Sequence, residues 1–93
     1  MVAELSEKVY RYENMLKKAL EKADYAPIEQ SHMYKIAEDF YNMALSYYED
    51  GKHFIELKDL VNALGCFSYG HAWLDAGARL GLFNVDDETL FTI

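Results

Sequence analysis

Apolar residues recur along the first part of the chain at alternating steps of four and three positions. They are Leu5, Val9, Tyr12, Leu16, Ala19 and Ala23. This spacing forms one apolar stripe along a helix. The pattern predicts an amphipathic helix over residues 3–24, with one side in water.

A second apolar stripe follows at Ile36, Ala37, Phe40, Met43, Ala44 and Tyr47. Pro27 suits the first turn of a helix because its nitrogen has no hydrogen to donate, and Glu29 would meet the positive end of the helix dipole. Gly51 lies just past the last residue of the stripe, four positions after Tyr47, where a left-handed cap is common. We therefore expect a second helix over residues 27–50 and a turn over residues 52–58.

A third helix is expected over residues 57–81, with Asp59 as its cap or first residue and Gly81 at its end. This helix is apolar around most of its circumference, and its clearly polar positions are Asn62, Ser68, Asp75 and Arg79. A helix of this kind is buried on more than one side. We expect it to lie between the other two helices or against another subunit.

Small residues form two further faces of the third helix. One face consists of Val61, Gly65, Ala72 and Ala76, and the other of Ala63, Gly70 and Gly77. A glycine inside a helix costs about 0.5 to 1 kcal/mol relative to alanine. Close approach by a neighbouring helix explains this most simply, and a ligand or partner chain along the glycine face is the alternative.

The helices together predict an all-α fold, a compact antiparallel three-helix bundle. One domain would span residues 1–93, with residues 82–93 as a short tail, and no segment of convincing length has the period of a strand. The second and third helices also resemble a tetratricopeptide hairpin in the spacing of Phe40, Met43, Ala44 and Tyr47 and of Ala63, Phe67 and Gly70. No second copy of this motif exists, which excludes a solenoid built from repeats.

Composition narrows the class of protein. The 93 residues are 52% hydrophobic and 15% aromatic, which is enough to fold around one core. The net charge is -7 and no cluster of basic residues lies beside aromatics outside residues 1–26, where acidic residues are interleaved with the basic ones, which argues against nucleic-acid binding. The single cysteine, the absence of an apolar leader and the lack of a membrane-length apolar window predict a cytoplasmic protein that does not span a membrane.

Patterns for catalysis and metal binding are missing from the sequence. His32, His53 and His71 are too far apart for a local zinc signature, and Glu29 with His32 is the one pair with the spacing of a carboxylate metal motif. Neither a phosphate-binding loop nor a nucleophile elbow is present. We expect no catalytic residues, no metal and no cofactor, and hence no enzyme.

Polar residues stack along one edge of the third helix. His71, Asp75 and Arg79 are spaced by four, and the order of Asp75 and Arg79 favours an ion pair between them. The pair would either lock the helix at the border of the core or form an anion or partner site in which Arg79 supplies a planar fork. With Tyr69, these three residues are the candidate contacts to a ligand or partner.

Aromatic and small residues suggest an association surface. Tyr47 and Tyr48 point to different faces, which would leave one of them near the surface. The candidate interface residues are Tyr48, Trp73, Gly70 and Gly77. The sequence thus favours a protein-interaction module that binds a protein partner or forms a homodimer. The alternative is an accessory domain that binds a small ligand or nucleotide through the polar edge of the third helix.

The run from Tyr69 to Phe83 resembles an archaeal family, number 357 among the domains of unknown function. Its most specific part is WLDAG-x-RLGLF, from Trp73 to Phe83, supported by residues 59–64 and 47–51 and by the ending Phe-Thr-Ile. The resemblance covers residues 5–93. It implies a compact, all-helical, cytoplasmic archaeal domain that occurs in some longer chains beside a nucleotidyltransferase-like domain, with no established activity and no catalytic residues.

Overall fold

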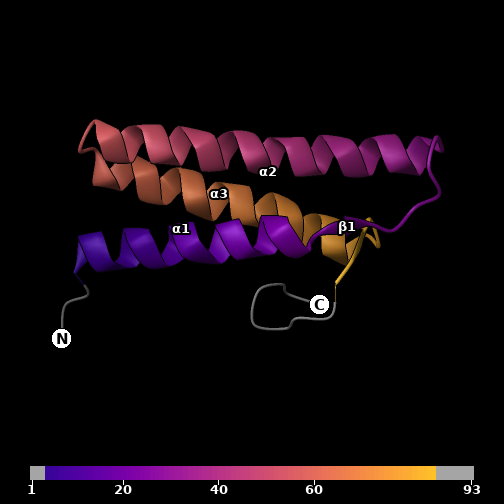
Figure 1. The fold of residues 1–93 in the computed structure, drawn as a ribbon, viewed down its shortest axis with the longest axis horizontal. Helices are drawn as coiled ribbons and strands as arrows, with labels where there is room; N and C mark the ends of the chain where they lie inside the picture. Colours follow the sequence, from indigo (N-terminus) through magenta and orange to yellow (C-terminus); the bar gives the residue numbers. More distant parts are fainter. Residues whose placement is uncertain (1–3, 86–93) are drawn as a thin grey trace.

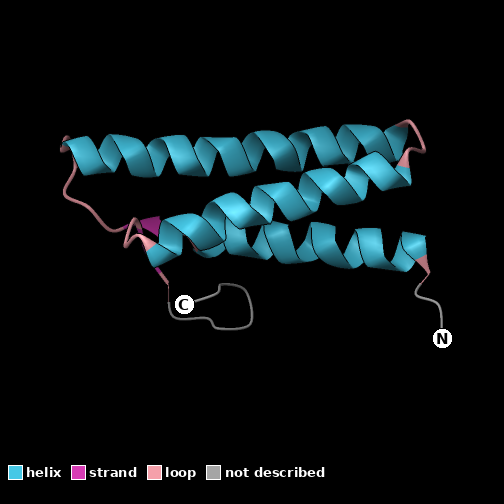
Figure 2. Cartoon of the chain, turned by 180° about the vertical axis from the view of Figure 1, so that it is seen from behind, coloured by secondary structure: helices cyan, strands magenta, loops and turns pink. Residues whose placement is uncertain are grey.

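The computed structural model describes residues 4–85. Its elements are α1 (Leu5–Lys22), β1 (Asp24–Tyr25), α2 (His32–Glu56), α3 (Leu60–Arg79) and β2 (Phe83–Asn84). Successive helices run antiparallel, and α3 lies between α1 and α2 in both views (Figures 1 and 2). The predicted all-α three-helix bundle is confirmed, while the likeness to a tetratricopeptide hairpin stays a prediction.

The start of α2 differs from the prediction. The helix begins at His32, after Ser31, whose side-chain oxygen accepts a hydrogen bond from the backbone N–H of Tyr34 at 3.1 Å. Pro27 instead lies in the connection that precedes the helix. The cause is the pairing of β1 with β2, which keeps the chain extended up to Ala26, whose N–H donates to Leu82 at 2.9 Å.

The end of α2 also differs, because Gly51 lies inside the helix, which continues to Glu56. Gly51 is buried, and the ring of Phe67 occupies the space that a β-carbon at this position would need. The glycine therefore permits α2 and α3 to pack closely rather than ending the helix. The connection between α2 and α3 is therefore shorter than the predicted turn over residues 52–58 and consists of residues 57–59.

Asp59 caps α3, as expected, by accepting a hydrogen bond from the backbone N–H of Asn62 at 3.1 Å. Gly81 follows the helix with φ at 79°, which also agrees with the expected stop. The predicted tail begins differently, because Leu82 and Phe83 are buried in the core and β2 pairs with β1 in antiparallel register. Residues 86–93 of that tail lie outside the described residues.

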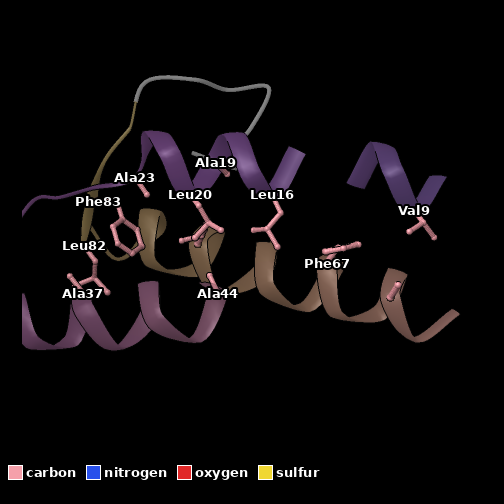
Figure 3. Packing of buried hydrophobic residues seen from close by; sticks show 12 residues of the cluster. Val9, Leu16, Ala19, Leu20, Ala23, Ala37, Ala44, Phe67, Leu82 and Phe83 are labelled. Carbon is pink, nitrogen blue, oxygen red and sulfur yellow. The ribbon is translucent and has the colours of Figure 1, made fainter. Parts of the chain in front are cut away.

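The core lies where all three helices meet. Its largest fully buried side chains are Phe67, Leu16, Leu74, Leu82 and Val9. Figure 3 shows Leu16 and Leu20 of α1 directed toward α3, with Ala44 of α2 on the opposite side. The expected position of α3 between the other two helices is confirmed, and it leaves one side of α3 exposed.

Candidate functional site

Of the polar residues along one edge of α3, His71 and Asp75 approach each other, whereas Arg79 does not join them. His71 Nε2 lies 3.8 Å from Asp75 Oδ1, and their side chains are 17% and 29% exposed. Arg79 is exposed and forms no ion pair with any residue from 4 to 85. The expected ion pair between Asp75 and Arg79 is therefore not formed.

Tyr69 lies on a different side of the helix from this edge. It stands two positions before His71, which places the two side chains about 160° apart around the helix axis. The ring of Tyr69 is 60% exposed and packs on the ring of Tyr47, with 5.0 Å between their centroids. The structure thus brings His71 and Asp75 together but does not join them with Tyr69 in one site.

The two aromatic interface candidates are half-buried in the chain itself. Tyr48 packs on Phe67 at 6.1 Å between centroids, and burial, with a smaller effect of Glu13, raises the pKa of its hydroxyl. Trp73 packs edge-on against Phe40 at 5.0 Å. The Trp73 indole nitrogen is buried without a hydrogen-bond partner among residues 4–85. Both rings therefore border the surface rather than standing on it.

The two glycines expected in an interface are core positions. A β-carbon on Gly70 would lie 3.0 Å from Leu16 Cδ2 and 3.0 Å from Tyr47 Cβ. One on Gly77 would overlap the ring of Phe83. Close approach of elements of the same chain thus explains these glycines. They present no surface to a partner, contrary to the interface role expected for them.

The exposed side of α3 contains two of the candidate contacts, Tyr69 and Arg79, but was not itself expected to be the site. It consists of Val61, Asn62, Gly65, Ser68, Tyr69, Ala72, Ala76, Arg79 and the capping residue Leu80, which we call the α3 outer face. Val61 is 70% exposed and Leu80 is 62% exposed. The sequence signal for this face was the helical grouping of Val61 with Gly65, Ala72 and Ala76, which did not reveal which side the bundle leaves open.

Gly65 differs from the buried glycines. A β-carbon at this position would have no neighbouring atom within 4 Å. Packing among the described residues therefore gives no reason for a glycine here.

Other features of residues 4–85 add little chemistry. In this part of the chain, no group of three His, Cys, Asp or Glu side chains could hold a metal ion, and no helix has the length and apolarity needed to cross a bilayer. An open pocket of about 530 Å³ lies at the end of the β1–β2 pair, lined by Lys22, Asp24, Asn84 and Val85. Burial and the charge of Asp50 raise the pKa of the Cys66 thiol, which disfavours a reactive thiolate.

Comparison with known proteins gives one match. Residues 11–83 match the model of a family described as a protein of unknown function, DUF357. This range includes all of α2 and α3 and most of α1. No curated protein and no solved structure matches the chain significantly.

Proposed function

The chain belongs to the DUF357 family of proteins of unknown function, and from its surface we propose that it is a protein-interaction module without catalytic activity of its own. The contact surface is the α3 outer face. The observation that carries this proposal is the distribution of charge. Only Arg79 is charged among the eight exposed positions within α3, whereas six of the nine exposed positions of α1 are charged.

A low charge density favours burial against another protein. Moving a charged side chain out of water costs free energy unless it is paired, and the centres of protein interfaces are accordingly depleted of charge and enriched in tyrosine. Tyr69 lies in the middle of the α3 outer face, with Val61 toward one end and Leu80 at the other. This face is therefore the part of the described surface that a partner protein can cover with the smallest loss of solvation free energy.

A matched pair of charge substitutions tests the proposal. Ala72→Glu adds a negative charge to the α3 outer face, and Asn14→Glu adds the same charge to the exposed side of α1. The wild-type chain and both variants would be used as bait in a lysate of the source organism, with a second, differently tagged copy of the chain added. Proteins captured by the wild type and by Asn14→Glu should be lost with Ala72→Glu, although all three chains melt at similar temperatures. Equal capture by all three would contradict the proposal.

A binding domain for small ligands is supported by one feature, the approach of His71 to Asp75 at 3.8 Å. A thermal-shift screen with nucleotides and phosphorylated metabolites separates the two functions. A rise in melting temperature that disappears in Asp75→Asn would favour ligand binding. We also propose a cytoplasmic location, which the single cysteine supports.

A further inference from the structure

Resting on the proposed function, we infer that the partner protein presents an arginine, whose guanidinium stacks on the exposed ring of Tyr69 and pairs with the carboxylate of Asp50. These two residues come from different helices and lie at the border between the α3 outer face and α2. The partner is thus recognised by an aromatic ring beside a carboxylate, at the edge of a face with a single charged residue.

The ring of Tyr69 is available to a planar cation. It is 60% exposed, and it packs on the half-buried ring of Tyr47, with 5.0 Å between the centroids and 49° between the ring planes. Arginine stacks on tyrosine because the guanidinium is planar and weakly hydrated and because the face of the ring is electronegative. A ring that its own chain already holds in place loses little freedom when such a cation binds.

Asp50 lies within one helical turn of this pair of rings. It follows Tyr47 by three positions on α2, and Cys66 precedes Tyr69 by three positions on α3. Because α2 and α3 run antiparallel (Figure 1), the contact between the two tyrosines places Asp50 opposite Cys66. Burial, and then the charge of Asp50, raises the pKa of the Cys66 thiol, which agrees with this placement. Three positions correspond to about 4.5 Å along the helix, a separation that one guanidinium can span.

Asp50 has no cationic partner among residues 4–85, because none of the ion pairs in this part of the chain includes it. The ammonium of Lys52 lies instead 5.3 Å from the ring centroid of Tyr48. Arg79 is the last residue of α3, far along the helix from this border. Covering a carboxylate costs solvation free energy unless the partner supplies a cation. The charge of Asp50 therefore favours a partner with an arginine over a purely apolar one.

Titration with short basic peptides tests the contact. The probes are acetylated, amidated tri-arginine and tri-lysine, which carry the same charge, added at low salt to the isotope-labelled chain and followed by NMR. Tri-arginine should bind about threefold more tightly than tri-lysine, because the guanidinium combines stacking with a bidentate contact to a carboxylate. The largest amide shifts should surround Tyr47, Asp50 and Tyr69. Equal affinities, or shifts centred on another part of the chain, would overturn the inference.

Two pairs of variants assign the contact to its residues. Asp50→Asn should lower the affinity for tri-arginine about threefold or more, whereas Glu38→Gln, which removes the same charge from another exposed position of α2, should change it less than about twofold. Tyr69→Leu should abolish the preference for arginine over lysine, and Tyr69→Phe, which keeps the ring, should retain it. Equal effects of Asp50→Asn and Glu38→Gln would mean that net charge alone binds the peptide, and the inference would fail.

Capture from a lysate distinguishes failure of this inference from failure of the proposed function. A protein that is lost with Ala72→Glu should also be captured less by Asp50→Asn, and tri-arginine should release it from the wild-type chain. If Ala72→Glu loses the protein while Asp50→Asn retains it in full, the arginine contact is wrong and the interaction module stands. If both variants capture as much as the wild type, this inference fails together with the proposed contact surface.

Discussion

On the inner side of α3, Gly70 and Gly77 lie where neighbouring side chains leave no room for a β-carbon, whereas on the outer side Gly65 faces open space. The same residue type thus stands in one helix in two different environments. The inner glycines let Leu16, Tyr47 and Phe83 approach the helix backbone. The outer glycine has no such neighbour, and it lies on a face with a single charged residue. A glycine that lowers helix stability and packs against nothing in its own chain is therefore informative about the surface on which it lies.

The largest effect is expected from Phe67→Ala on the inner side. Phe67 is 1% exposed, and its ring fills the space above Gly51. Removing a buried phenylalanine side chain costs about 3–5 kcal/mol of unfolding free energy, because both burial and packing are lost. Urea denaturation monitored by circular dichroism measures the change. Val61→Ala on the outer side is the control and should stay within about 0.5 kcal/mol of the wild type. Equal losses of unfolding free energy in the two variants would contradict the described difference between the inner and outer sides of α3.

Gly51→Ala should have the next largest effect. The added methyl group would overlap the ring of Phe67 and force it to move. Overpacking of this kind costs about 1–3 kcal/mol, which exceeds the gain of about 0.5–1 kcal/mol from the higher helix propensity of alanine. Urea denaturation should show a lower midpoint. A higher midpoint would mean that the contact between α2 and α3 is looser than described.

Replacement of Gly65 by alanine should change the unfolding free energy in the opposite direction, toward higher stability. A methyl group there meets open space, so that only the helix propensity changes. Gly65→Ala should stabilise the chain by about 0.5–1 kcal/mol when unfolding is measured at a dilution that keeps it monomeric. Destabilisation would show that this position is already in contact with another part of the chain.

The smallest effect concerns Cys66, at the border between the two sides. Burial, and then the charge of Asp50, raises the pKa of its thiol above the ordinary value of 9.0. The stabilisation linked to the neutral thiol is fully present below the unfolded-state pKa and is lost as the pH rises through the folded-state pKa. The wild type should therefore lose slightly more stability than Cys66→Ala when the pH is raised past 9. Parallel pH dependence in urea denaturation would contradict the assigned environment.

Periodicity predicted the helices well because each helix has one continuous apolar stripe. The stripe at Val9 and Leu16, the cap at Asp59 and the stop at Gly81 are all local signals, and the structure agrees with each. Gly51 was misinterpreted because the same residue serves as a cap or as a contact, and only the position of Phe67 distinguishes the two.

The start of α2 and the role of Leu82 depend on contacts between distant residues. The pairing of Tyr25 with Phe83 joins segments nearly sixty positions apart, which a local pattern does not reveal. The candidate site had the same limitation. A helical projection grouped Gly65 with Ala72, but it gave no means of telling this exposed side from the buried side of Gly70.

The most direct test of the two-sided account of α3 is the unfolding free energy of Gly65→Leu beside that of Gly70→Leu, both measured by urea denaturation against the wild type. Leucine at position 65 meets open space and is a better helix former than glycine, so unfolding should not become easier. At position 70 the same side chain collides with Leu16 and Tyr47, and the account predicts a loss of about 1–3 kcal/mol or more. Equal changes in the two variants would contradict it.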